Sequence, residues 1–186
     1  CLSDWRNLCI CRMTQLELPA LLGQWFGESE FLPHRMGKTL TVPIFMATGA
    51  AAEGLTARTE LHSEPIGNCM LMLHGRKRWT LVAPQESHLL QPTLARDGRA
   101  YFLSTLHAEG PDWLKHVRHW QGETSAGDVL WVPPWTWHRV EYVQNVTALS
   151  ASLFHFRPAQ FALANGVFAA LSIPNILKEV IGWKTQ

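Results

Sequence analysis

Short hydrophobic runs recur along most of the chain, and glycine or proline lies between many of them. Seven segments of suitable length are expected to be strands, and they span residues 39–48, 58–62, 68–73, 78–82, 129–132, 139–143 and 147–156. Runs of this kind, bounded by turn residues, are typical of β-strands. Many short strands with helices only at the chain ends predict a mainly β protein, a double-stranded β-helix or jelly roll.

The pattern changes to a helical spacing at both ends of the chain. Apolar residues between Met13 and Phe26 recur as in a short amphipathic helix. Pro158 suits the first turn of a C-terminal helix, which Pro174 is expected to break. The predicted parts are an N-terminal, partly helical segment at 1–38, the barrel at 39–157 and C-terminal helices at 158–186.

The sequence also predicts the form of three connections between the strands. Residues 74–77 are expected to form a tight hairpin in which Gly75 supplies the turn. Proline and glycine punctuate residues 84–120, which predicts a loop-rich insertion of the kind that often forms a lid or a binding loop. Residues 121–127 are expected to be a turn.

The composition fits one globular domain. The chain has 186 residues, of which 47% are hydrophobic and 17% are charged. This length allows a substantial core. The net charge of +1, with both signs mixed along the chain, gives no electrostatic reason to propose nucleic acid as a main partner. No uncharged apolar run reaches the length of a membrane span.

The cysteines and the first residue bear on the cellular setting. The chain begins with Cys1 rather than Met, so we expect a fragment whose targeting signal, if any, lies outside it. The four cysteines are Cys1, Cys9, Cys11 and Cys69. Their spacing favours free or buried thiols over a zinc site or a disulfide, which indicates an intracellular protein.

Two clusters of residues carry candidate chemistry. His62 and Glu64 are two apart on a predicted strand, so their side chains should share one face. His138 ends a second cluster that begins at Gly127 and contains a hydrophobic strand and a double proline. Two histidines and one carboxylate on one side of a metal form the facial triad of non-haem Fe(II) oxygenases. A structural zinc site would close all four positions, usually with cysteine, and Cys69 is not spaced for that.

At these residues the sequence resembles the Jumonji-C branch of the cupin-like Fe(II)/2-oxoglutarate oxygenases, especially the protein-hydroxylase-like members. The resemblance covers about residues 40–157. Its first motif is carried by Thr59, His62, Glu64, Asn68, Gly75 and Lys77, and its second motif by the segment from Gly127 to His138. The family's tyrosine for 2-oxoglutarate is not at its expected position, and the chain has only Tyr101 and Tyr142.

The resemblance implies a role for each matching residue. The implied iron ligands are His62, Glu64 and His138. The implied 2-oxoglutarate residues are Lys77, for the distal carboxylate, with Thr59, Asn68 and Ser152, the last standing with Ser150 where relatives carry Asn. A lysine ammonium can make a charge-assisted bond to a dicarboxylate. The competing interpretation of Lys77 is a solvated lysine in the hairpin.

The function implied by the resemblance is an Fe(II)- and 2-oxoglutarate-dependent oxygenase that hydroxylates a protein or peptide side chain with O2. One alternative is a cupin-like binding or scaffold protein without catalysis. Another is a metal-dependent cupin that does not use 2-oxoglutarate, although such sites usually carry three histidines. The C-terminal helices are expected either to close one end of the barrel or to form a homodimer face, as in related enzymes.

Three tryptophans cluster around the second motif, at Trp131, Trp135 and Trp137. Large aromatic residues beside a barrel mouth can pack in the core or stack against a substrate. We favour core packing.

Overall fold

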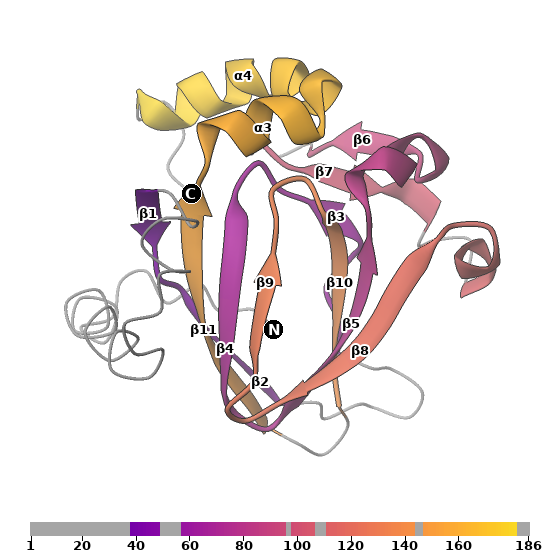
Figure 1. The fold of residues 1–186 in the computed structure, drawn as a ribbon, viewed down its shortest axis with the longest axis vertical. Helices are drawn as coiled ribbons and strands as arrows, with labels where there is room; N and C mark the ends of the chain where they lie inside the picture. Colours follow the sequence, from indigo (N-terminus) through magenta and orange to yellow (C-terminus); the bar gives the residue numbers. More distant parts are fainter. Residues whose placement is uncertain (1–37, 49–56, 96–97, 107–110, 144–146, 182–186) are drawn as a thin grey trace.

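Two antiparallel sheets face each other in the computed structural model, which describes residues 38–48, 57–95, 98–106, 111–143 and 147–181 (Figure 1). The first sheet has the order β1 (Lys38–Thr41), β11 (Thr147–Phe156), β4 (Gly67–His74) and β9 (Val129–Val132), and β2 (Ile44–Thr48) also pairs with β11. The second has the order β6 (Pro92–Leu94), β7 (Phe102–Ser104), β3 (His62–Ser63), β10 (Trp137–Tyr142), β5 (Arg76–Val82) and β8 (His119–Ser125). The predicted jelly roll is confirmed.

The space between the sheets holds a hydrophobic cluster built from alternate strand residues. Met70, Trp79, Val140 and Ala148 come from four different strands and belong to this cluster. Because side chains alternate along a strand, residues two or four positions away on the same strand face the same interior. The polar residues described below enter the interior in this way.

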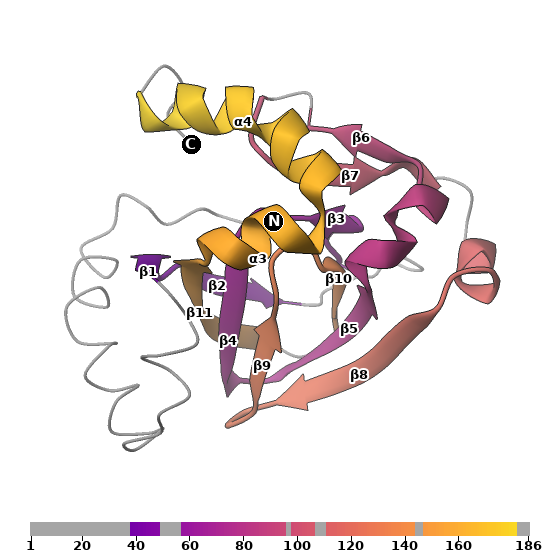
Figure 2. The ribbon, with the colours of Figure 1, turned by 45° about the horizontal axis from the view of Figure 1, so that its top comes forward.

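The two C-terminal helices, α3 (Pro158–Ala164) and α4 (Gly166–Val180), cover one end of the sheets (Figures 1 and 2). Phe168 of α4 stacks on Phe102 with ring centroids 3.9 Å apart. It also meets the Trp137 ring edge-on at 5.9 Å. The expectation that these helices close one end of the barrel is therefore confirmed.

The predicted break at Pro174 is wrong, because α4 runs through that residue. The break lies at Asn165 instead, where the backbone is extended (φ −154°, ψ 86°). The Asn165 side chain accepts the Phe168 N–H at 3.1 Å and so caps α4. Burial of Phe168 and Asn175, on either side of Pro174, holds both halves of the helix in place.

The outer surface of the helices carries several exposed apolar side chains. They are Leu163, Val167, Leu171, Ile173, Leu177, Val180 and Ile181. A homodimer through this surface stays a prediction. No helix in the described part of the chain has both the length and the apolar character needed to span a bilayer.

Gly75 is a corner between the sheets and not a hairpin turn. It joins β4 of the first sheet to β5 of the second, and these two strands do not pair with each other. Its φ of 75° lies in the left-handed region, which favours glycine. A Cβ atom at this position would collide with the carbonyl oxygen of Thr147. The hairpin prediction is therefore wrong, although the need for glycine was correctly inferred.

Two further predictions about local structure need correction. Residues 119–125 form strand β8 and not a turn, and they pair with β5 along their whole length. Thr124 is the only buried residue of this edge strand, so the strand lacks the alternation by which strands are recognised. The single strand expected at 39–48 is two strands, interrupted at residues 42–43 by a proline that cannot donate to the sheet.

The insertion at 84–120 is more regular than its sequence suggests. It contains the 3₁₀-helices η1 (Pro84–Leu89) and η3 (Pro111–Lys115), together with β6 and β7. β7 pairs with β3, so the insertion extends the second sheet next to His62. The predicted amphipathic helix between Met13 and Phe26 lies outside the described residues.

Candidate metal centre

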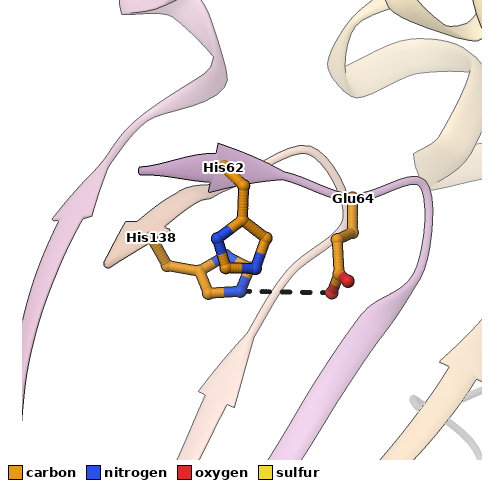
Figure 3. A group of neighbouring side chains, drawn as sticks. All are labelled: His62, Glu64 and His138. Atoms are coloured by element: carbon orange, nitrogen blue, oxygen red, sulfur yellow. Dashed lines mark ion pairs between the residues drawn. The ribbon is translucent and has the colours of Figure 1, made fainter. Parts of the chain in front are cut away.

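His62, Glu64 and His138 come together where β3 pairs with β10 (Figure 3). His62 and His138 are direct cross-strand partners, and their ring centroids are 4.1 Å apart. One ligand atom from each of the three residues lies within 4.8 Å of the other two. Among the residues that the structure describes, no other such cluster of His, Cys, Asp or Glu could hold a metal ion.

Backbone carbonyls orient both imidazole rings. His62 Nδ1 lies 2.7 Å from the Glu60 carbonyl oxygen, and His138 Nδ1 lies 3.0 Å from the Thr136 carbonyl oxygen. Because a carbonyl oxygen can only accept, each Nδ1 is the donor, and Nε2 is the nitrogen that remains available as a ligand atom. This is the arrangement in which histidine usually binds a metal.

The charges at the centre suit a cation. Burial lowers the pKa of His138 to about 3, assisted by the charge of His62 and opposed by the Thr136 hydrogen bond. Since His138 is neutral near pH 7, its 4.0 Å approach to the Glu64 carboxylate is a polar contact rather than an ion pair. Burial raises the pKa of Glu64, while the charges of His62 and Arg99 oppose that shift. Two imidazoles and one carboxylate are a donor set that fits Fe(II), with further positions open.

Trp135 connects the two motifs that supply the ligands. Its backbone N–H donates to the Glu64 carbonyl at 2.7 Å, and its own carbonyl accepts from the Ser63 hydroxyl at 2.9 Å. Its φ of 63° is unusual for a residue other than glycine and costs on the order of 1 kcal/mol. The buried indole donates to the Phe161 carbonyl at 2.8 Å. The double proline before Trp135 was the only sequence signal for this tight link.

The tryptophans themselves lie mainly in the core. Trp135 and Trp137 have no exposed surface, which confirms the core interpretation for both. Trp131 is half-buried, and its indole N–H donates to Nε2 of His155 at 3.2 Å.

Lys77 lies inside the barrel rather than in solvent. Its side chain is 3% exposed, and Nζ donates to the Ser150 hydroxyl at 2.5 Å. The Nζ atom also lies 5.5 Å from the Phe45 ring centroid and 5.3 Å from the Tyr142 ring centroid. Burial lowers the pKa of Lys77 to about 8. The competing interpretation of a solvated lysine is therefore wrong.

No carboxylate within the described ranges forms an ion pair with Lys77. Its described contacts are one hydroxyl and two aromatic faces. A buried cation without an anionic partner is costly, because neither dipoles nor rings replace the lost hydration in full. This position therefore suits the carboxylate of a ligand.

The triad and Lys77 face the same interior. In the pairing of β5 with β10, His138 lies opposite Leu81 and Tyr142 lies opposite Lys77. Four residues along β10 separate the Cα atoms of His138 and Tyr142 by about 13 Å. A ligand between the two ends would be enclosed by both sheets.

The other residues implied for 2-oxoglutarate lie around this space. Asn68 is buried, and its side-chain oxygen has no hydrogen-bond partner. Ser152 is also buried and faces the same way as Ser150, which contacts Lys77. The Thr59 hydroxyl accepts the Val140 N–H at 2.9 Å, which leaves its own proton for another acceptor. Their roles toward 2-oxoglutarate stay predictions.

Tyr142 is a candidate ligand-binding residue that sequence reasoning did not place. It is 4% exposed and lies against the Lys77 ammonium. Its position four residues after His138 on one strand was a usable signal, because that spacing gives both side chains the same face. Burial raises the pKa of its phenol, so the hydroxyl stays protonated and can donate to a carboxylate.

Comparison with known proteins places the chain among characterised folds. The family model described as "Cupin-like domain" matches residues 13–159. The chain is 34% identical over 100 residues to human HSPB1-associated protein 1. This alignment covers 50% of this chain and 20% of that protein. It is 33% identical over 89 residues to JmjC domain-containing protein D of Dictyostelium discoideum, covering 45% of this chain and 19% of that protein.

The chain therefore spans about a fifth of the length of these relatives. Among solved structures, a variant of oxalate decarboxylase from Bacillus subtilis aligns with a TM-score of 0.40 and 18% identity, covering 64% of this chain and 22% of the other. A likeness this slight supports no conclusion about function.

Proposed function

The chain belongs to the cupin-like, JmjC-type domain family, and on that premise we propose that it is an Fe(II)- and 2-oxoglutarate-dependent oxygenase that hydroxylates a protein side chain. The observation that carries the proposal is Lys77, a buried lysine without a carboxylate partner among the described residues. It faces the same interior as the His–Glu–His centre. A dicarboxylate that binds the metal with one end would meet this cation with the other.

In this proposal, His62, Glu64 and His138 hold Fe(II) from one side. The carbonyls of Glu60 and Thr136 fix the two imidazoles through Nδ1, which would leave both Nε2 atoms available to bind the ion. Three protein ligands leave positions for a cosubstrate and O2. When bound, Fe(II) supplies redox chemistry with O2 that couples conversion of 2-oxoglutarate to succinate and CO2 with hydroxylation of a C–H bond.

The remaining residues bind and orient the cosubstrate. Lys77 pairs with the distal carboxylate, and Tyr142 and Ser150 are placed to donate hydrogen bonds to it. Asn68, whose side-chain oxygen lacks a partner, and Thr59 are available for further polar contacts. The apolar residues between the sheets exclude water from this space, which strengthens each charged contact.

The proposal is tested by following 2-oxoglutarate conversion to succinate in air with Fe(II) and ascorbate. We expect slow turnover without a second substrate, loss of turnover in Lys77→Met, and no change in the surface control His88→Ala. His88 is exposed and lies outside both motifs, so it controls for the loss of a histidine.

Two results would contradict the proposal. Absence of succinate from iron-loaded protein, with 2-oxoglutarate present, would favour a non-catalytic binding protein. Equal turnover in the wild type and Lys77→Met would favour a metal-dependent cupin in which this lysine has no part.

A further inference from the structure

Two residues of the insertion lie beside the metal centre. The Tyr101 ring meets the His62 ring edge-on, with centroids 6.3 Å apart and an interplanar angle of 80°. The guanidinium carbon of Arg99 lies 5.6 Å from the centroid of the Tyr101 ring. Arg99, Tyr101 and His62 thus form a continuous row that ends at a metal ligand.

This row lies on the accessible side of the centre. His138 is almost fully buried at 6% side-chain exposure, whereas Glu64 retains 24%. Tyr101 is half-buried and Arg99 is exposed. A second substrate that approaches from the exposed side therefore meets a positive charge.

The backbone of Arg99 is held by helix α4. The Asn175 side-chain amide donates to the Arg99 carbonyl at 3.3 Å. The next residue, Ala100, donates its N–H to the Glu179 carboxylate at 3.2 Å. Figure 2 shows α4 running beside β6 and β7, between which Arg99 lies in the chain. Two hydrogen bonds from one helix fix where the arginine side chain begins.

The two cations near the centre occupy different environments. Lys77 is buried between the sheets, where a small cosubstrate would be enclosed. Arg99 is exposed, so its side chain is accessible to a substrate that approaches from solvent. A guanidinium in this position is suited to bind a carboxylate through paired hydrogen bonds.

We propose that Arg99 selects an acidic peptide segment as the second substrate by binding a carboxylate next to the residue that enters the metal centre. This inference rests on the proposed hydroxylase function for the identity of the substrate as a peptide. It assigns Lys77 to the cosubstrate and Arg99 to the substrate.

The test uses two pools of blocked peptides that differ only in carrying Asp and Glu, or Lys and Arg, at the varied positions. Binding of each pool to the Mn(II)-loaded chain is measured with and without 2-oxoglutarate. We expect the wild type to prefer the acidic pool by about tenfold, the size of one charge-assisted contact. The preference should reverse in Arg99→Glu and persist in Arg99→Lys.

Lys178→Glu is the matched control, because Lys178 is an exposed cation on the same helix that holds Arg99. The control should bind both pools as the wild type does. Equal binding of the two pools, including no binding of either, overturns the inference. So does an Arg99→Glu variant that loses metal affinity but keeps the wild-type preference, since Arg99 would then act on Glu64 alone.

Failure of the proposed function would give a different result. A chain that ignores 2-oxoglutarate, yet binds the acidic pool through Arg99, would retain the anion-binding surface without the oxygenase chemistry.

Discussion

The metal end and the lysine end of the barrel interior share strand β10 but are built in different ways. At the metal end, both histidines are oriented by carbonyls two residues earlier in the chain. At the lysine end, Lys77 is surrounded by Phe45, Tyr142 and Ser150, which come from three other strands.

The histidines are therefore positioned by residues near them in the sequence, and Lys77 by residues distant from it. A ligand histidine that bonds to a carbonyl two residues earlier is oriented by its own short segment of the chain. A buried lysine reaches its environment only when both sheets have closed around it, and the folded protein then carries an uncompensated charge. We therefore expect the metal end to tolerate changes in distant packing, and the lysine end to gain stability when its charge is removed or paired.

The largest effect should follow from His138→Ala, which removes one of three ligands. We expect metal affinity to fall by more than about a hundredfold, since even loss of a supporting hydrogen bond to a ligand costs tenfold to a hundredfold. Titration calorimetry with Mn(II) measures the loss. His88→Ala should bind like the wild type, and a His138→Ala chain with unchanged affinity would exclude this residue from the centre.

Lys77→Met should affect ligand binding at the lysine end without affecting metal binding at the other end. We expect 2-oxoglutarate affinity to fall by about tenfold to a hundredfold, because a charge-assisted bond is lost, while Mn(II) affinity stays within about twofold of the wild-type value. Calorimetric titration of each ligand in turn distinguishes these effects. Arg78→Met, which changes an exposed residue of the same strand, is the control. Parallel loss of both affinities would show that the ends are not independent.

The stability of the lysine end should depend on pH in a defined direction. Burial lowers the pKa of Lys77 from 10.5 to about 8, so between these values the unfolded chain holds a proton that the folded chain has released. The free energy of unfolding should therefore rise between pH 8 and 10.5, by an amount on the order of 2 kcal/mol. Denaturation at both pH values, compared between the wild type and Lys77→Met, isolates this contribution. An equal pH dependence in the two chains would contradict it.

The smallest effect concerns the link between the motifs. Ser63→Ala removes the hydroxyl that donates to the Trp135 carbonyl, so we expect a loss of about 1 kcal/mol in stability and about tenfold in metal affinity. Ser104→Ala is a matched control, because Ser104 is also fully buried and donates to a carbonyl, that of Leu90. If both variants lower metal affinity equally, the effect is general destabilisation.

Residues that act through local spacing were predictable. His62 and Glu64 are two apart, so their side chains meet at the end of β3, although this strand is His62–Ser63 and not the predicted 58–62. His138 was recognisable from the motif that surrounds it. Strand β11 was predicted with its observed bounds, since its ten residues are buried enough to show a clear hydrophobic pattern. These features depend on a few neighbouring residues.

Features that depend on tertiary structure were not predictable. The left-handed Trp135 is held by contacts with Ser63 and Glu64, which lie some seventy residues earlier. β6 and β7 have three residues each, too few to show a period, and they form because β7 pairs with β3 and β6 pairs with β7. The contact of Lys77 with Ser150 required the register of β11, which the sequence does not supply.

The most direct test of the two-ended site is an anaerobic titration of the Fe(II)-loaded chain with 2-oxoglutarate, following the metal-to-ligand charge-transfer band in the visible. The account predicts a saturable band in the wild type, a band that needs far more 2-oxoglutarate in Lys77→Met, and none in His138→Ala. A wild-type chain that binds iron but gives no band at millimolar 2-oxoglutarate would contradict it.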